Sequence, residues 1–286
     1  MELTDLKIFV TVAEEGNISR AAKRLDYVQS NMTARIRKLE TELGVQLFHR
    51  LPKGVELTER GIQFKNDSLK ILNLSEKAIK TVQETTYPSG PLSIGIVETA
   101  TCSNFMNTIF HFQKQFPQVS LSLTTGSSQD LHSQVLNHQL DGAFVTDDIK
   151  SPLLVCEYTV KDEIVLLTKK TGGSYPDLSK VTWAIFPRDC PFSTITEEWL
   201  HTEGVPSFRM VEIGSLEMIL SSVRSGFAVT LLPKSVLSAS FHDEFLCFYP
   251  IPEKFRYTHT NLIRHKDHFV SKAFKAFVKM FRESEI

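Results

Sequence analysis

Cysteine is scarce in this chain of 286 residues, and its four positions are far apart, at Cys102, Cys156, Cys190 and Cys247. No two of them form a CxxC pair, so the spacing argues against a zinc site and supplies no disulfide framework. We therefore expect reduced thiols, a cytoplasmic protein, and neither a metal ion nor a cofactor.

Long apolar runs are also missing. No segment approaches the roughly 20 apolar residues that cross a bilayer, and no signal peptide is visible, so we expect no membrane partner. Enzyme motifs are equally absent: there is no GxSxG elbow, and His132 and His138 lack the HExxH spacing. We predict that the chain is not an enzyme.

Charge is nearly balanced over the whole chain, with a net value of -1, but it is locally uneven. From Arg20 to Lys65 there are ten lysines and arginines against five carboxylates, a local net charge of +5. A solvated lysine-rich surface would explain this charge. A basic module that binds nucleic acid, attached to an acidic body, explains it better if the segment also has a suitable fold.

Residues 17–50 supply such a fold, because they predict a helix-turn-helix. Ser19 is expected to cap a short helix, and a longer helix should run from about Gln29 to Leu43. One face of the longer helix carries apolar residues at helical spacing: Met32, Ile36, Leu39 and Leu43. Its other face is polar and basic, as suits the major groove of double-stranded operator DNA.

The polar face supplies the predicted DNA contacts. Base-side contacts are predicted for Gln29, Ser30, Thr33 and Arg37, and phosphate contacts for Arg35, Arg50 and Lys53. Ser19 and Asn31 complete the predicted DNA-binding set. For any one of these residues, the alternative is an exposed side chain with no role in binding.

A hairpin and a long helix should follow. Residues 45–57 predict a β-hairpin, or wing, with Lys53 at its tip. The helix should begin at Thr58–Glu59 and reach about Thr86, with one apolar stripe: Ile62, Leu69, Leu72, Ile79 and Val82. The stripe could pack on the chain's own body. Because operator-binding proteins usually work as symmetric pairs, we favour a homodimer through this helix.

From Leu92 onward, strands and helices alternate, and the order of elements repeats once. This predicts two α/β lobes with mainly parallel sheets. Two apolar strands, 163–167 and 260–263, are expected to cross between the lobes. The last helix, 270–281, should return to cover the first lobe.

A ligand site is expected where the strands of these lobes end, because ligands of open α/β sheets bind beyond the carboxyl ends of strands. The candidate residues are Thr99, Ala100, Thr101, Gly126, Ser127, Ser128, Val145, Thr146, Phe192, Ser193, Gly214, Ser215 and Leu216. Hydroxyl and backbone N–H groups dominate this set, which predicts a small polar or carboxylate-bearing effector. Alternatively, the hydroxyls only cap helices.

The chain resembles LysR-type transcriptional regulators from end to end. The resemblance rests on Ser19-Arg20-Ala21-Ala22-Lys23-Arg24-Leu25, on Ile36-Arg37-Lys38-Leu39-Glu40-x-Glu42-Leu43-Gly44-Val45-x-Leu47-Phe48-x-Arg50, and on Leu57-Thr58-x-x-Gly61. It implies a winged helix-turn-helix, a dimerising linker helix, a two-lobed domain like periplasmic binding proteins, and a homotetramer built as a dimer of dimers. Two short motifs depart from the family. Its usual Thr-Gln-Pro is Val28-Gln29-Ser30 here, and its usual Ser-Arg is Thr33-Ala34.

The expected organisation is therefore an α/β multidomain chain. Residues 1–58 form the winged helix-turn-helix, 59–87 the linker helix, and 91–286 the effector-binding domain. Within that domain, lobe I covers about 91–161 and 266–286, and lobe II about 162–265. The expected function is sequence-specific transcriptional regulation, modulated by a small molecule in the cleft between the lobes. The alternatives are a thiol-based redox regulator using Cys102 or Cys190, and a solute-binding protein without a regulatory role.

Overall fold

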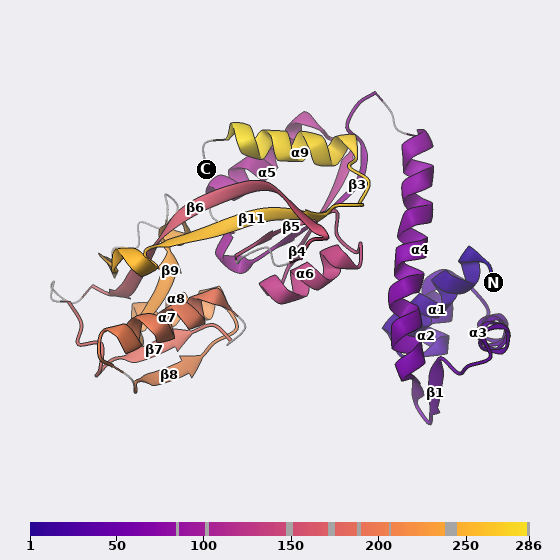
Figure 1. Ribbon diagram of the computed structural model, residues 1–286, viewed down its shortest axis with the longest axis horizontal. Coiled ribbons are helices and arrows are strands. Elements are labelled where there is room, and N and C mark those ends of the chain that lie inside the picture. Colours follow the sequence, from indigo (N-terminus) through magenta and orange to yellow (C-terminus); the bar gives the residue numbers. More distant parts are fainter. Residues whose placement is uncertain are drawn as a thin grey trace. The chain divides into compact units, whose positions relative to one another are not determined.

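The computed structural model describes residues 1–83, 86–100, 103–146, 151–170, 175–187, 190–205, 207–237 and 245–284. The chain forms two compact units, Met1–Glu84 with Asn137–Gln139, and Thr85–Leu136 with Leu140–Ile286 (Figure 1). In the described ranges no helix combines the length and apolar character that crossing a bilayer requires.

The first unit is a winged helix-turn-helix followed by a long helix. Its elements are α1 (Leu3–Glu15), α2 (Ile18–Leu25), α3 (Gln29–Leu43), β1 (Phe48–Leu51), β2 (Gly54–Leu57) and α4 (Glu59–Gln83). The three short helices enclose a core in which Phe9, Met32 and Ile36 are fully buried. Strands β1 and β2 pair antiparallel as the predicted wing. The predicted helix-turn-helix and wing are confirmed.

The start of α2 differs from the prediction in its capping residue. The Asn17 side-chain oxygen accepts hydrogen bonds from the backbone N–H groups of Ser19 (2.9 Å) and Arg20 (3.1 Å). Asn17 therefore caps the helix, and the prediction that Ser19 does so is wrong. An N-cap must have extended backbone and lie two or three residues before the N–H groups that it binds, which Asn17 does.

The junction between the wing and α4 explains the Leu57-Thr58-x-x-Gly61 motif. The Thr58 hydroxyl accepts the Gly61 N–H (2.9 Å) and donates to the Gln46 carbonyl (2.9 Å). A Cβ atom at Gly61 would lie 2.1 Å from the Leu47 carbonyl oxygen, so only glycine fits without displacing the backbone. Thr58 thus caps α4 while Gly61 lets the helix approach the start of the wing.

The apolar residues of α4 do not form the single stripe predicted from the sequence. Leu69 and Leu72 pack against the core of the first unit, as does Phe64. A different set is exposed along one side of the helix, at spacing i, i+3, i+7 and i+11: Ile71, Leu74, Ala78 and Val82. One face of the helix therefore packs against its own unit, while a second apolar face stays exposed within the chain.

Lobe I of the second unit has helices on both faces of a sheet. Its elements are β3 (Gly90–Ile96), η1 (Glu98–Ala100), α5 (Ser103–Gln115), β4 (Val119–Thr125), α6 (Ser128–Leu136), β5 (Gly142–Val145) and α9 (Lys272–Glu283). Figure 1 shows α5 and α9 on one face and α6 on the other, each over its own apolar cluster. Helix α9 contributes Phe274, Phe277 and Phe281 to the first cluster, which confirms that the last helix returns to cover lobe I.

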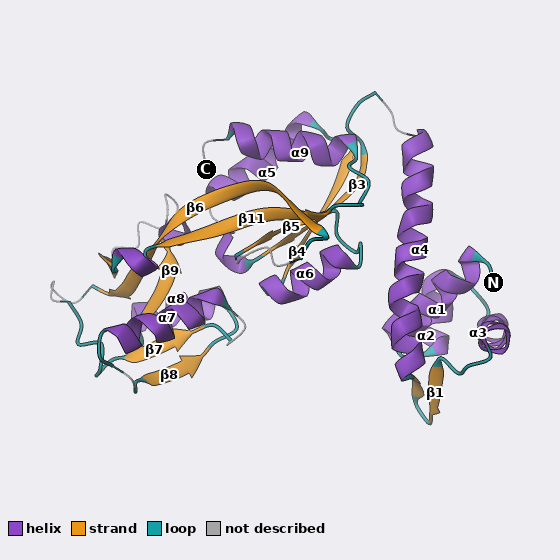
Figure 2. Ribbon diagram, viewed as in Figure 1, coloured by secondary structure: helices purple, strands orange, loops and turns teal. Residues whose placement is uncertain are grey.

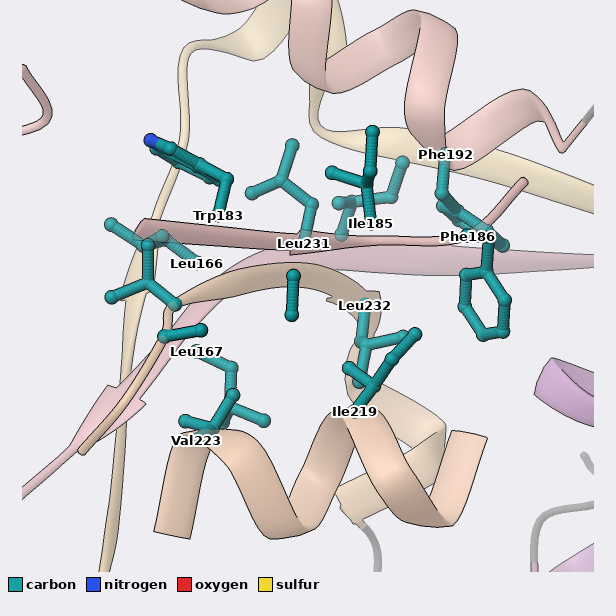
Figure 3. Close-up of a cluster of buried hydrophobic side chains, with 14 of the residues drawn as sticks. Leu166, Leu167, Trp183, Ile185, Phe186, Phe192, Ile219, Val223, Leu231 and Leu232 are labelled. Atoms are coloured by element: carbon teal, nitrogen blue, oxygen red, sulfur yellow. The ribbon is translucent and has the colours of Figure 1, made fainter. Parts of the chain in front are cut away.

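Lobe II is built around a second apolar core. Its elements are β7 (Thr182–Ile185), α7 (Pro191–Thr202), β8 (Arg209–Glu212), α8 (Leu216–Ser225), β9 (Thr230–Pro233), η2 (Lys234–Leu237), β10 (Leu246–Pro250) and η3 (Glu253–Phe255) (Figure 2). Figure 3 shows Ile219 and Val223 of α8 directed at the strands of this core. The rings of Trp183 and Trp199 meet edge to face with centroids 5.8 Å apart.

Two long strands, β6 (Leu154–Lys169) and β11 (Tyr257–His265), run antiparallel to each other and take part in both lobes. β11 pairs with β5 in lobe I, while the end of β6 pairs with β9 and β10 in lobe II. The predicted crossing strands are thus confirmed. The prediction of mainly parallel sheets is wrong, because these crossing strands add antiparallel pairs to the parallel pairs β3–β4, β3–β5 and β7–β8.

Candidate functional site

The exposed face of α3 carries a shallow groove. Its lining residues are Val28, Gln29, Ser30, Thr33, Ala34 and Arg37. The structure therefore brings together all four residues predicted to contact bases, while Met32, Ile36 and Leu39 hold the opposite face of the helix in the core. Val28 and Ala34 were not in the predicted set. Their side chains have no polar atoms, so the pattern of hydrogen-bonding residues did not indicate them.

Arg35 lies outside this groove and is occupied within its own unit. Its guanidinium is 2.6 Å from the Asp5 carboxylate and 3.4 Å from that of Glu2. Burial raises the pKa of Asp5, but the Glu2 amide and the Arg35 guanidinium outweigh this effect and hold the pKa below its ordinary value. Because Arg35 joins α3 to α1 in this way, its geometry does not favour the predicted phosphate contact.

The remaining predicted DNA-binding residues lie at separate places on the surface of the unit. Arg50 extends from β1, with its guanidinium 3.6 Å from the Glu40 carboxylate. Lys53 is exposed in the turn between the wing strands, and Ser19 and Asn31 are exposed near the starts of α2 and α3. Arg50 and Lys53 thus place positive charge on the wing, where a phosphate could approach.

Two other cations of the basic segment lie on α2 and are paired with groups of α1. The Arg24 guanidinium donates to the carboxylates of Glu14 (2.8 Å) and Glu15 (3.1 Å), and these hydrogen bonds raise the pKa of Arg24. Arg20 donates to the Glu15 carbonyl oxygen. The local net charge therefore overstates the positive charge that α2 can present to a partner.

A cavity of about 390 Å³ lies between the two lobes of the second unit. Its described lining residues are Val97, Glu98, Thr99, Thr125, Gly126, Ser127, Ser128, Asp130, Thr146, Phe186, Pro187, Cys190, Pro191, Phe192 and Gly214. They follow the ends of strands or begin helices, as the topology predicts for a ligand site. Seven of them belong to the predicted effector set: Thr99, Gly126, Ser127, Ser128, Thr146, Phe192 and Gly214.

Five predicted residues are not part of this lining. Ala100 belongs to η1, and Val145 is fully buried in an apolar cluster. The Ser193 hydroxyl is buried and donates to the Phe186 carbonyl oxygen (2.6 Å). Ser215 is the N-cap of α8 and Leu216 its first residue. Thr101 lies outside the described residues, as does Cys102.

The helix starts around the cavity are already engaged by the chain itself. At α6, the Ser127 hydroxyl accepts the Asp130 N–H (3.1 Å). At α7, the first residue is Pro191, which has no N–H to offer. At α8, the Leu216 N–H donates to the Glu98 carboxylate (2.8 Å), which comes from lobe I. A ligand carboxylate would therefore compete with internal partners at α6 and α8.

Glu98 was not among the residues predicted from the sequence. It is the first residue of η1, shortly after β3, and nothing in the local sequence indicates that its carboxylate reaches α8, 118 residues later. Together with Asp130 it places carboxylate groups on the cavity wall, and none of the described lining residues is a lysine, arginine or histidine.

Metal and thiol chemistry gain no support from this site. In the ranges that the structure describes, no group of three or more His, Cys, Asp or Glu side chains could hold a metal ion. Cys190 lines the cavity and is partly buried, and neither it nor the other described cysteines, Cys156 and Cys247, takes part in a disulfide.

Comparison with known families accounts for both units. Residues 3–62 match the bacterial regulatory helix-turn-helix protein, lysR family, and residues 85–285 match the LysR substrate binding domain. The HTH-type transcriptional regulator SoxR of Arthrobacter sp. (strain TE1826) is 36% identical over 284 residues, 99% of this chain and 98% of that protein. The HTH-type transcriptional regulator CzcR of Bacillus subtilis (strain 168) is 38% identical over 284 residues, with the same coverage of 99% and 98%.

Solved structures share the fold. A full-length OxyR variant from Pseudomonas aeruginosa aligns with a TM-score of 0.78 at 21% identity, covering 100% of this chain and 96% of that one. Full-length CbnR in complex with its target DNA aligns with a TM-score of 0.71 at 24% identity, covering 99% of this chain and 100% of that one. At these identities the likeness concerns the fold alone.

Proposed function

The chain belongs to the LysR family of DNA-binding transcriptional regulators, which carry an effector-binding domain, and from this premise we propose which residues perform each task. The groove on α3 reads the operator. Gln29, Ser30, Thr33 and Arg37 contact base edges, because a helix with amide, hydroxyl and guanidinium groups on its exposed face matches the major groove.

Arg50 and Lys53 contact phosphates beside the reading helix. Both extend from the wing, and both keep an exposed side chain. Arg35 is left out because its guanidinium is paired with Asp5. Such contacts strengthen binding to all sequences and make it dependent on salt, while the groove residues determine sequence preference.

The single observation that carries the DNA-binding assignment is the convergence of the four polar readers in one groove opposite a buried apolar face. Selection of operator sequences from a random DNA pool by the full chain tests it. Gln29→Ala should lose about tenfold in affinity for the selected operator and should change the preferred base at one position. Lys53→Ala should weaken all sequences alike and reduce the salt dependence. An unchanged base preference in Gln29→Ala would contradict the assignment.

The cavity between the lobes binds the effector. Its hydroxyl groups and its two carboxylates, Glu98 and Asp130, can accept hydrogen bonds from hydroxyl or amino groups of a ligand. Of the effector classes considered from the sequence, we therefore favour a small polar molecule over one bearing a carboxylate. Such a ligand would also meet the Glu98–Leu216 hydrogen bond that joins the lobes. A ligand bound next to this hydrogen bond could strengthen or break it, and so change how the two lobes are arranged.

The working unit is a homodimer through α4, and a homotetramer arranged as a dimer of dimers. The exposed apolar side of α4 supports the first contact, and the family supports oligomerisation in general. Operator binding places the protein in the cytoplasm with the DNA. No enzymatic role is proposed, and the thiol-switch alternative is not favoured.

A further inference from the structure

The groove on α3 contains a large apolar side chain that the fold does not use. Val28 precedes the first residue of α3 and is 71% exposed. Its backbone is extended, and its side chain makes no capping hydrogen bond with the helix. A valine is a poor capping residue, because it has no atom that can accept a hydrogen bond from the first N–H groups of the helix. Packing and capping therefore do not explain its presence at this position.

The neighbours of Val28 leave room for a base edge to reach it. Ala34, also exposed, lines the same groove with a single methyl group. The Thr33 hydroxyl donates to the Gln29 carbonyl oxygen (3.0 Å) within the helix. The wall of the groove is thus polar at Gln29, Ser30 and Arg37 and apolar at Val28 and Ala34.

An apolar side chain in a major-groove reader can discriminate only one kind of base edge. Thymine is the only standard base with a methyl group in the major groove, and apolar side chains recognise it by contact. Residues at the N-terminal end of a recognition helix are the ones that approach base edges. Val28 occupies that end of α3.

We propose that Val28 is a specificity-determining residue, which selects a thymine in each operator half-site by packing on its 5-methyl group. This inference rests on the proposed function, because it requires α3 to lie in the major groove. It adds a contact by shape and apolar burial to the hydrogen bonds of Gln29 and Arg37. It also assigns a purpose to Val28, one of the residues at which the chain departs from the usual family pattern.

Single-atom changes in the DNA test the proposal. An operator is first selected from a random pool with the full chain, and each thymine is then replaced by uracil. Uracil keeps every hydrogen-bonding group and lacks only the methyl. For the unmodified protein, one such replacement per half-site should lower affinity by about three- to tenfold, as expected for loss of one buried methyl contact. For Val28→Ala, the same replacement should have little effect.

Val45→Ala provides the matched control. It makes the same chemical change at a residue that is 40% exposed and lies outside the groove, so it should keep the full dependence on the thymine methyl. Thermal unfolding should be equal for the unmodified protein and Val28→Ala, which separates recognition from stability. If every uracil operator binds the unmodified protein normally, or if Val28→Ala keeps the dependence, the inference is overturned alone. If no sequence is enriched at all, the proposed function fails and the inference fails with it.

Discussion

His265 is a buried side chain whose protonation should oppose folding. Burial lowers its pKa, an effect that His268, Lys266 and Arg264 reinforce and Asp267 partly offsets. Its Nδ1 atom accepts the Asp267 N–H (3.1 Å). Only a neutral ring with Nδ1 unprotonated can accept this hydrogen bond. The neutral form of His265, with Nδ1 unprotonated, therefore stabilises the folded state.

The sign of the pH dependence follows from this lowered pKa. In the unfolded chain His265 titrates near its ordinary value of about 6.5. The stabilisation from the neutral folded form is complete above that pH and is lost as pH falls through the lower pKa of the folded state. We expect the free energy of unfolding, measured by urea denaturation, to fall as the solution is acidified through this range, and to fall less steeply in His265→Gln. His259→Gln, at an exposed position of β11, should keep the original slope. Equal slopes in both variants would contradict this account.

The position of a side chain was predictable where it depends only on the helix that carries it. Gln29, Ser30, Thr33 and Arg37 share a groove because helical spacing puts them there. The ion pair of Arg35 was not predictable, because its partner Asp5 is 30 residues away in the sequence. A long-range ion pair leaves no periodic pattern, so sequence reasoning treats such an arginine as available for DNA.

At the scale of elements, the close contact between α4 and the start of the wing depends on Gly61. A methyl group there would collide with the Leu47 carbonyl oxygen, and backbone atoms on both sides must move to relieve the collision. Gly61→Ala should destabilise the first unit by about 1–3 kcal/mol, the usual cost of overpacking. Gly214→Ala serves as the control, since a Cβ atom there meets nothing within 4 Å. Thermal unfolding followed by circular dichroism measures both, and equal midpoints would refute the expectation.

The start of α8 is held by Glu98, and this contact can be measured directly. In Glu98→Ala the Leu216 amide loses its acceptor, and its hydrogen exchange should accelerate by about tenfold or more. Glu98→Gln keeps an acceptor oxygen, so its exchange rate at Leu216 should lie between those of the unmodified protein and Glu98→Ala. Glu217→Ala removes a carboxylate that pairs with Arg224 on the same helix, and should leave exchange at Leu216 unchanged. Unaltered exchange in Glu98→Ala would show that the contact contributes nothing to holding α8.

Elements themselves were largely predictable, because hydrophobic period and turn residues are local properties. The helix-turn-helix, the wing, the crossing strands and the final helix all emerged from such patterns. The apolar stripe of α4 was misassigned for a physical reason. Leu69 and Leu72 recur with helical spacing, but spacing alone does not tell whether a residue packs on its own unit or awaits a partner.

At the scale of the whole molecule, the exposed side of α4 predicts self-association. Leu74 is 64% exposed in the middle of the uncovered apolar set. Leu74→Glu should remove the α4 contact, which would lower the sedimenting mass of the assembly, and should weaken operator binding, because two linked readers bind a symmetric site more tightly than one. Ile62→Glu, 53% exposed near the other end of the same helix and outside that set, is the matched control. A Leu74→Glu protein that sediments like the unmodified chain would remove α4 as the dimer contact.

The arrangement of whole lobes was predicted only in part. Alternating strands and helices correctly indicated two α/β lobes, but strand direction was misjudged. Direction depends on which strands become neighbours, and β6 and β11 are joined by pairings such as Val160 with Thr260, 100 residues apart. The lining of the cavity was hard to predict for the same reason, because residues far apart in the sequence, such as Glu98 and Phe192, line it together.

The antiparallel pairing of β6 and β11 also has a consequence for how such regulators diversify. The chain enters lobe II along β6 and returns along β11, so both ends of the intervening segment lie side by side. Backbone hydrogen bonds hold these ends, and they depend little on which side chains are present. A foreign lobe could therefore be grafted through two adjacent junctions. Recombination at this point would give a lineage a new chemical signal while its operator and its target genes stay the same.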